Sequence, residues 1–324
     1  MPDNNLSMLE EFFEDYVPER KTSETREITE LPQQPTKLTL DEEDEAKAWA
    51  KKAKEKREAA FAMIQETAES IFKSTGKMKL IDYLIVQSNF PDYTVRNCLL
   101  VSAQRPGATM LRSFDGWRDL GDRIIIKKKS VGITVIEPGE EYVRRDGTVG
   151  RYYNTRTLFD ISQIQGYDPE PITEEIDING KLTTLFHVTN SFRIKIFSHT
   201  DESRAVLYSP QDIRMYINKS AERQIILYQL LIELAHSIFA DRDDYSRMKY
   251  GFMCQAVGYI VCRMIGESDL SSNIADSFDV PTEYTDLKKN DVIAILESIK
   301  RASHTIFNEY RKQLKKLQKS GSDE

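Results

Sequence analysis

Two turn signals in the middle of the chain constrain its fold more than any other feature. Pro138-Gly139 and Asp146-Gly147 separate three short segments rich in Ile, Val, Tyr and Thr, at 123–126, 132–137 and 152–161. Such residues favour strands, and Pro-Gly and Asp-Gly are typical of the turns between strands. On both sides of this region apolar residues recur at helical spacing instead. The sequence therefore predicts an α+β fold, with N-terminal helices plus a small antiparallel sheet, followed by a mainly helical domain.

Helical periodicity also sets the expected domain boundaries. Helices are predicted at 41–73, 78–88 and 94–103, and the pattern returns from Pro210 to about residue 317. The intervening segment contains Pro169, Pro171 and Asn179-Gly180, which predicts a linker with a hairpin. The expected parts are an acidic flexible tail at 1–40, a helix-and-sheet domain at 41–166, a linker or hairpin at 167–202, a helical domain at 203–319 and a short tail at 320–324.

The net charge of −7 is unevenly distributed along the chain. Residues 1–45 hold 14 Asp and Glu against 4 Lys and Arg, whereas residues 77–163 hold 14 Lys and Arg against 10 Asp and Glu. The acidic tail includes an apolar cluster from Leu6 to Tyr16, so residues 1–20 are a possible site for a protein partner. The positive excess lies where a phosphate-binding surface would need it.

Cysteine usage and hydropathy bear on the compartment. Cys98, Cys254 and Cys262 form neither a disulfide framework nor a CxxC pair, which is typical of reduced thiols in a cytoplasmic protein. No window approaches the roughly 20 apolar residues of a membrane span. We therefore expect a cytoplasmic protein that does not associate with a membrane.

Aromatic and cationic residues are interleaved between Tyr93 and Gln163. Single-stranded nucleic acid is held by aromatic faces that stack on bases, about 1–3 kcal/mol per base, and by cations that follow the phosphates. The alternative, which composition alone favours, is that Trp117 and the tyrosines belong to the core and the lysines are ordinary turn charges. The residues predicted to bind nucleic acid are Tyr93, Arg96, Asn97, Gln104, Arg105, Trp117, Arg118, Lys127, Lys128, Lys129, Arg151, Tyr152, Tyr153 and Gln163.

Several motifs in this stretch resemble a known family. Tyr93 to Thr109, Trp117-Arg118-Asp119-Leu120-Gly121, Lys127 to Gly132 and Phe159-Asp160-Ile161-Ser162-Gln163 are similar, in that order, to the N-terminal domain of the ArdC-type antirestriction proteins and the related LtrC-like proteins of conjugative plasmids and integrative elements. The resemblance implies single-stranded-DNA binding. Two positions depart from the family pattern: Lys129 stands where a Gly is usual, and Ile164 where a Thr is usual.

The resemblance also implies a zincin-like metallopeptidase fold for the helical domain. A working zincin has an H-E-x-x-H helix, in which two His bind zinc and the Glu activates a bound water. Here the window is Ile232-Glu233-Leu234-Ala235-His236, so Ile replaces the first His. The next helix has Met253 and Gln255 near the position where the family has a Glu ligand. We therefore predict no catalytic residues, no metal and no cofactor, with Glu233 and His236 as vestiges.

These observations favour a non-catalytic single-stranded-DNA-binding accessory protein of a mobile genetic element, related to antirestriction or conjugation. Two alternatives remain open. One is a zinc metallopeptidase with altered ligands, for which His236, Glu233 and Cys254 are the candidates. The other is a protein-interaction scaffold that uses the acidic tail and the solvated first half of the long helix at 41–73.

Overall fold

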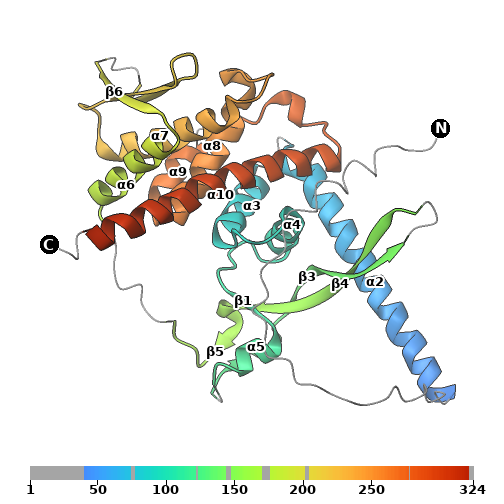
Figure 1. Cartoon of the computed structure of the whole chain (residues 1–324). Coiled ribbons are helices and arrows are strands. Elements are labelled where there is room, and N and C mark those ends of the chain that lie inside the picture. Colours follow the sequence, from blue (N-terminus) through green and yellow to red (C-terminus); the bar gives the residue numbers. More distant parts are fainter. Residues whose placement is uncertain are drawn as a thin grey trace, which may run out of the picture. The chain divides into compact units, whose positions relative to one another are not determined.

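The structure, a computed structural model, describes residues 40–73, 77–121, 123–143, 147–169, 176–200, 204–276 and 278–320. The described residues from 48 to 320 belong to one compact unit. The predicted acidic tail, the possible partner site within residues 1–20 and the tail at 321–324 lie outside the described residues. Helices and small sheets make up the described part of the chain, which confirms the α+β class (Figure 1).

The three helices predicted before the strands are confirmed to within about two residues at each end. They are α2 (Leu40–Ile71), α3 (Lys77–Asn89) and α4 (Val95–Gln104). Most side chains of α2 between residues 47 and 59 are exposed, whereas Ile64, Ala68 and Ile71 farther along the helix are buried, as their spacing predicts. Thr94 begins α4, because its side chain accepts a hydrogen bond from the amide of Asn97 at 3.3 Å.

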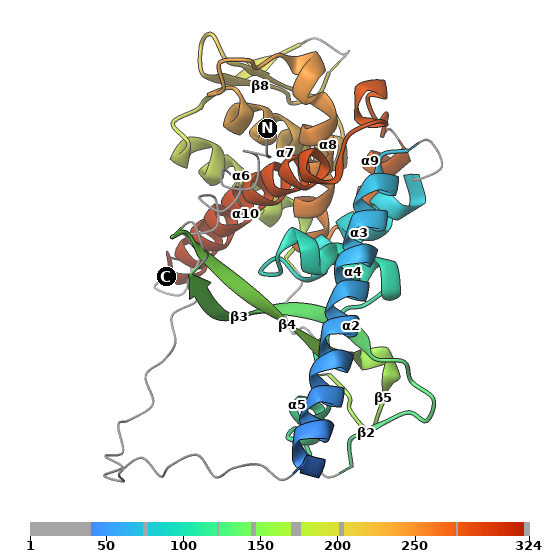
Figure 2. The same ribbon diagram turned by 90° about the vertical axis from the view of Figure 1, so that its right-hand side faces the viewer.

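The main sheet is a long twisted hairpin of β3 (Ile133–Val143) and β4 (Val149–Asp160) (Figure 2). The short β1 (Leu111–Arg112) pairs with the other side of β4. The prediction of a turn at Pro138-Gly139 is wrong, because β3 continues through it with an irregularity in register between Pro138 and Glu141. A bulge tolerates a Pro inside a strand, since the lost amide donor is not needed there.

The predicted strand at 123–126 does not join the main sheet, in which it was expected. It forms β2 (Ile125–Ile126), which pairs with β5 (Ile164–Gln165) in a separate two-stranded sheet rather than joining the hairpin. The helix α5 (Phe114–Arg118) precedes β2, and the 3-10 turn η3 (Ile161–Gln163) precedes β5. This small assembly lies at the end of the hairpin where β3 begins and β4 ends.

The prediction of a linker with a hairpin at 167–202 is wrong. Most of this segment is the helix α6 (Ile178–Ser191), followed by β6 (Lys195–His199). Asn179-Gly180 is the first turn of the helix, because the Asp177 side chain accepts a hydrogen bond from the Gly180 amide at 2.8 Å. A third sheet follows in the order β6-β8-β7, with β7 (Val206–Ser209) antiparallel and β6 parallel to β8 (Arg214–Asn218).

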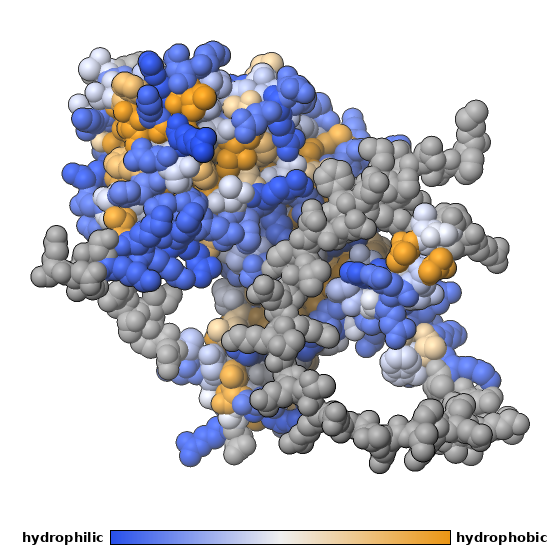
Figure 3. Space-filling view, viewed as in Figure 1, coloured by the Kyte–Doolittle hydropathy of each residue, from blue (hydrophilic) through white to orange (hydrophobic). Residues whose placement is uncertain are grey.

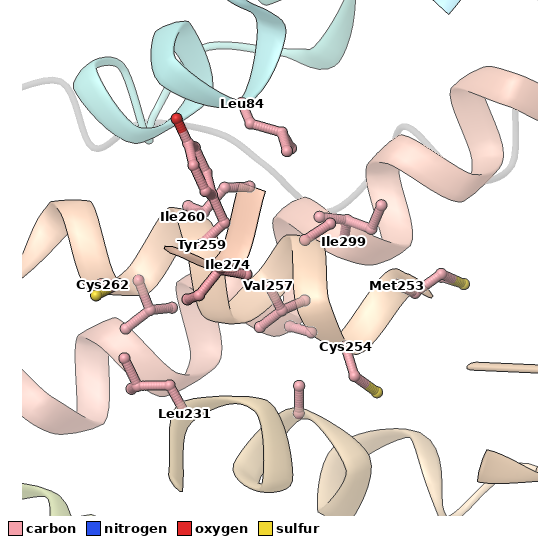
Figure 4. Close-up of a cluster of buried hydrophobic side chains, with 14 of the residues drawn as sticks. Leu84, Leu231, Met253, Cys254, Val257, Tyr259, Ile260, Cys262, Ile274 and Ile299 are labelled. Atoms are coloured by element: carbon pink, nitrogen blue, oxygen red, sulfur yellow. The ribbon is translucent and has the colours of Figure 1, made fainter. Parts of the chain in front are cut away.

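The helical pattern predicted from Pro210 begins only at Arg223, because β8 occupies Arg214–Asn218. From there the chain is helical, as predicted, with α7 (Arg223–Phe239), α8 (Arg247–Met264), α9 (Ser268–Asp276), the 3-10 turn η4 (Thr282–Tyr284) and α10 (Lys289–Ser320). Buried side chains of α8 pack against Leu84 of α3, Leu231 of α7 and Ile299 of α10 (Figure 4). Helices from both predicted domains therefore share one core. None of the described helices is long and apolar enough to cross a membrane.

Candidate functional site

A pair of tyrosine rings, one exposed and one half-buried, lies toward the end of the β3–β4 hairpin. The rings of Tyr142 and Tyr152 have centroids 4.4 Å apart, and Tyr152 is 51% exposed. Tyr142 lies opposite Gly150 in the antiparallel register. A Cβ on Gly150 would come within 2.6 Å of the Tyr142 ring, so the absence of a side chain lets this ring reach across β4 to Tyr152.

The aromatic pair continues into a polar surface along β4. Side chains alternate between the two faces of a strand, so Tyr152, Asn154 and Arg156 point to the same side, and all three are exposed. We call Tyr142, Tyr152, Asn154 and Arg156 the hairpin face. Arg156 donates to Glu137 at 2.9 Å and Arg151, on the other side, pairs with Glu141. Exposed pairs of this kind are worth about 0–1 kcal/mol, so a phosphate group can replace the glutamate as partner.

A second group of cations gathers at the other end of the hairpin. Arg105 donates to the Ser162 hydroxyl at 3.2 Å and Lys127 donates to the Ser162 carbonyl at 2.8 Å, which brings two predicted binding residues together. Lys127, Lys128 and Lys129 are exposed. We call Arg105, Lys127, Lys128 and Lys129 the basic turn. It precedes β3, whereas Tyr142 is the tenth residue of that strand, so about 30 Å of strand separates it from the aromatic pair.

The backbone of the basic turn is strained at one position. Lys129 has φ +66°, in the left-handed region that suits glycine and costs other residues about 1–2 kcal/mol. The resemblance places a Gly at this position, and the geometry supplies the reason for that preference. The chain thus carries a lysine at a position where the backbone conformation favours glycine.

Trp117 does not belong to a binding surface, and its prediction is corrected. It is only 1% exposed, its indole N–H donates to the carbonyl of Phe159 at 2.8 Å, and its ring meets Tyr167 edge-on. A buried ring with its polar atom satisfied anchors α5 to β4. Arg118 remains exposed but pairs with Asp115 at 3.0 Å.

Two predicted binding amides instead fasten α4 to the sheet. The Asn97 side chain accepts from the amide and donates to the carbonyl of Ile136, and Gln104 does the same with Thr134, all four bonds being 2.9 Å. β3 is an edge strand, and Thr134 and Ile136 present their backbone groups away from β4. We call the Asn97 and Gln104 side chains the edge clamps. They satisfy backbone groups of β3 that would otherwise be open to pairing with another chain.

Gln163 is also part of the interior. It is 3% exposed, accepts from the Asp160 amide at 2.9 Å and donates to the Val131 carbonyl at 2.8 Å. The Asp160 carboxylate accepts from the amides of Thr109, Met110 and Ser162. Burial raises the pKa of Asp160, but the hydrogen bonds from the Ser162 hydroxyl and these amides outweigh it and lower the pKa below its ordinary value. This network fixes the base of the hairpin.

The remaining predicted aromatics are partly covered. Tyr93 stacks on Phe90 at 5.0 Å and Tyr153 meets Phe61 edge-on at 5.9 Å, and both are half-buried. Arg96 is half-buried on α4 beside Asn97. Of the aromatic residues predicted from the sequence, Tyr152 alone presents an exposed ring, and its partner Tyr142 was missed because only the strand register brings the two together.

The Glu233 region of α7 is a closed structural cluster. Glu233 is 6% exposed, accepts from the Tyr208 amide at 2.7 Å and from Arg247 Nη1 at 3.0 Å, and pairs with Arg247 Nη2 as well. Arg247 Nη2 also donates to the Tyr208 carbonyl at 2.8 Å. One carboxylate and one guanidinium thus join β7, α7 and α8 in a ring of hydrogen bonds.

The residues that a zincin would use for metal do not fit zinc here. Ile232 packs on Gly258 of α8, where an added Cβ would lie 2.7 Å from Ile232 Cγ1. His236 is 4% exposed and its Nδ1 is 3.0 Å from the Tyr245 hydroxyl; burial first, then the charges of Arg247 and Arg204, lower its pKa to about 3. Burial also raises the pKa of the Cys254 thiol well above its ordinary value, which disfavours the thiolate. Within the described ranges, no three His, Cys, Asp or Glu side chains are grouped to hold a metal ion.

Comparison with known proteins returns solved structures of the type that the motifs resemble. No family model and no curated protein matches the sequence. The chain is similar to the metal-free crystal structure of the antirestriction protein ArdC from the R388 plasmid, with 16% identity and a TM-score of 0.47 over 68% of this chain and 86% of that one. The Mn(II)-bound structure of the same protein gives 13% identity and a TM-score of 0.46 over 70% and 91%.

Proposed function

We propose that this chain is a non-catalytic accessory protein of a mobile genetic element, related to antirestriction, that binds single-stranded DNA on the hairpin face and the basic turn. The observation that carries the proposal is the Tyr142–Tyr152 ring pair, in which Tyr152 is exposed and lies on β4 in line with the exposed Asn154 and Arg156. Aromatic faces stack on bases of any sequence, and neighbouring cations attract the phosphates. The motifs between Tyr93 and Gln163 that resemble the ArdC family support the same function.

The two surfaces have separate tasks in this proposal. The basic turn supplies three exposed lysines and Arg105, which attract the strand through its phosphates. The hairpin face supplies the stacking and holds unpaired bases, which a duplex does not present. A DNA strand that contacts both the basic turn and the hairpin face would follow the hairpin over about 30 Å. This length suits a binding site of several nucleotides.

The Glu233 cluster supports a binding role over peptide hydrolysis. In a zincin the glutamate must reach a metal-bound water. Here both Glu233 oxygens are hydrogen-bonded, one to Arg247 and the other to Arg247 and the Tyr208 amide. His236 bonds to Tyr245, and Ile232 packs against Gly258. In our proposal this helix stabilises the fold that carries the hairpin.

Paired variants test the proposal. Tyr142→Ala and Tyr152→Ala should each weaken binding of a fluorescein-labelled 15-nucleotide DNA by about 1–3 kcal/mol, measured by anisotropy, because each removes a stacking face. Trp49→Ala is the matched control, since Trp49 on α2 is 74% exposed and lies outside both surfaces. Equal affinities for all three variants and the original chain would refute the assignment of the hairpin face.

A further inference from the structure

The C-terminal end of α10 carries a dense group of cations. Between Tyr310 and Ser320 the helix contains five basic residues and no acidic one. All five side chains are exposed, and hydrophilic groups dominate this part of the surface (Figure 3). They are Arg311, Lys312, Lys315, Lys316 and Lys319, which we call the α10 basic face. Four of them line a shallow hollow together with Asn308.

These cations share one side of the helix. At about 100° per residue, the five side chains fall within an arc of about 140°, with Asn308 near its centre. The opposite side is occupied by Ile306, Tyr310 and Gln313, all buried. The helix is therefore attached to the protein through one side and presents a continuous positive surface on the other.

Ordinary helix energetics do not account for this density. Cations at spacings of three and four residues, such as Arg311 with Lys315 and Lys315 with Lys319, repel one another and destabilise a helix. The helix dipole favours cations only within the last turn, and Arg311 and Lys312 lie two turns before Ser320. Glu309 offsets part of the charge through its ion pair with Lys312 at 3.1 Å. The remaining repulsion is relieved when an anionic partner lies along the helix.

We infer that the α10 basic face binds the phosphate backbone of nucleic acid, as a surface separate from the hairpin face and the basic turn. This inference rests on the proposed single-stranded-DNA binding and extends the path of the strand to the C-terminal helix. A polyanion with regularly spaced charges matches a row of cations that repeats every turn of the helix. An anionic membrane fits less well, because the apolar side of α10 is buried and has no side chains left to insert into lipid.

The salt dependence of binding tests this inference. The triple variant Arg311→Gln, Lys315→Gln, Lys319→Gln removes three charges and retains good helix formers. For single strands each phosphate contact contributes about 0.7 to the slope of log K against log salt, so the slope should fall by about 2 for a 30-nucleotide DNA. The control is Lys51→Gln, Lys52→Gln, Lys56→Gln on the exposed part of α2, which changes net charge equally. Its slope should match that of the original chain.

The outcomes separate the two proposals. If the triple variant and the control show the same slope while Tyr152→Ala weakens binding, the α10 basic face is refuted and the proposed function stands. If the original chain does not bind DNA, both are refuted. If the triple variant instead loses binding to vesicles that contain phosphatidylserine and keeps its DNA slope, the partner is a membrane and the inference is wrong. Thermal unfolding adds a check: the triple variant should unfold no earlier than the original chain, whereas a purely structural role predicts a lower midpoint.

Discussion

Burial shifts the pKa of several side chains in this chain, and the shift of His236 is the one that bears on stability near neutral pH. Its pKa is lowered to about 3, mainly by burial, whereas an unfolded histidine titrates near 6.5. Below pH 6.5 His236 is therefore protonated in the unfolded state, whereas it stays neutral in the folded state. Stability is lost as the pH falls through this window, by about 1.4 kcal/mol per pH unit.

This linkage predicts a measurable difference between the original chain and His236→Gln, which retains a polar group beside Tyr245. Urea unfolding at pH 7, 6 and 5 should show the free energy of unfolding fall in the original chain below pH 6.5. The variant should lack that part of the pH dependence, because glutamine does not titrate. An unchanged dependence in the variant would show that His236 is protonated in the folded state.

Lys129 differs from His236 in that its side chain is exposed and its backbone is strained. Lys129→Ala keeps the left-handed strain and removes the charge, whereas Lys129→Gly removes both. We expect both variants to lose DNA affinity equally, and the Gly variant to be about 1 kcal/mol more stable than the Ala variant. Retention of full affinity by either variant would mean that the side chain does not contact DNA.

At the scale of elements, the edge clamps hold the hairpin to the helices. Asn97→Ala and Gln104→Ala each leave a backbone amide and carbonyl of β3 unsatisfied, which costs about 1–3 kcal/mol. Chemical denaturation should show this loss, while the affinity for single-stranded DNA changes less than about twofold. Asn190→Ala, at an exposed position on α6, is the matched control and should change neither quantity. A loss of DNA affinity without a loss of stability would show that the Asn97 and Gln104 side chains contact DNA.

Helices with a clear apolar period could be predicted from sequence, as the confirmed bounds of α2, α3 and α4 show. The prediction failed where a local signal has two structural meanings. Pro138-Gly139 is a bulge within β3 rather than a turn, and Asn179-Gly180 begins a helix because Asp177 caps it. Composition alone favoured a buried Trp117, but the family resemblance led us to place it on the binding surface. The structure buries it, because the side of α5 that faces the core depends on contacts distant in sequence. The Tyr142–Tyr152 pair depends on strand register, and the sequence does not specify register locally.

For the whole molecule, the shared core implies that the hairpin region and the helical region unfold together. α8 packs against α3, α7 and α10, and the buried cluster is continuous from Ala60 to Tyr310. In a Trp49→Phe variant, the fluorescence of Trp117 reports on the hairpin region alone, while circular dichroism reports on all helices. We expect the two denaturation curves to coincide. Separate midpoints would show that the helical region folds independently.

The proposed function requires that this chain bind single-stranded DNA in preference to duplex DNA. The most direct test is a titration of the full chain with one 15-nucleotide DNA, alone and annealed to its complement, at several salt concentrations. We predict tighter binding of the single strand than of the duplex, with affinity that falls steeply as salt rises, because phosphate contacts release counterions. Equal affinity for both forms, or affinity indifferent to salt, would contradict it.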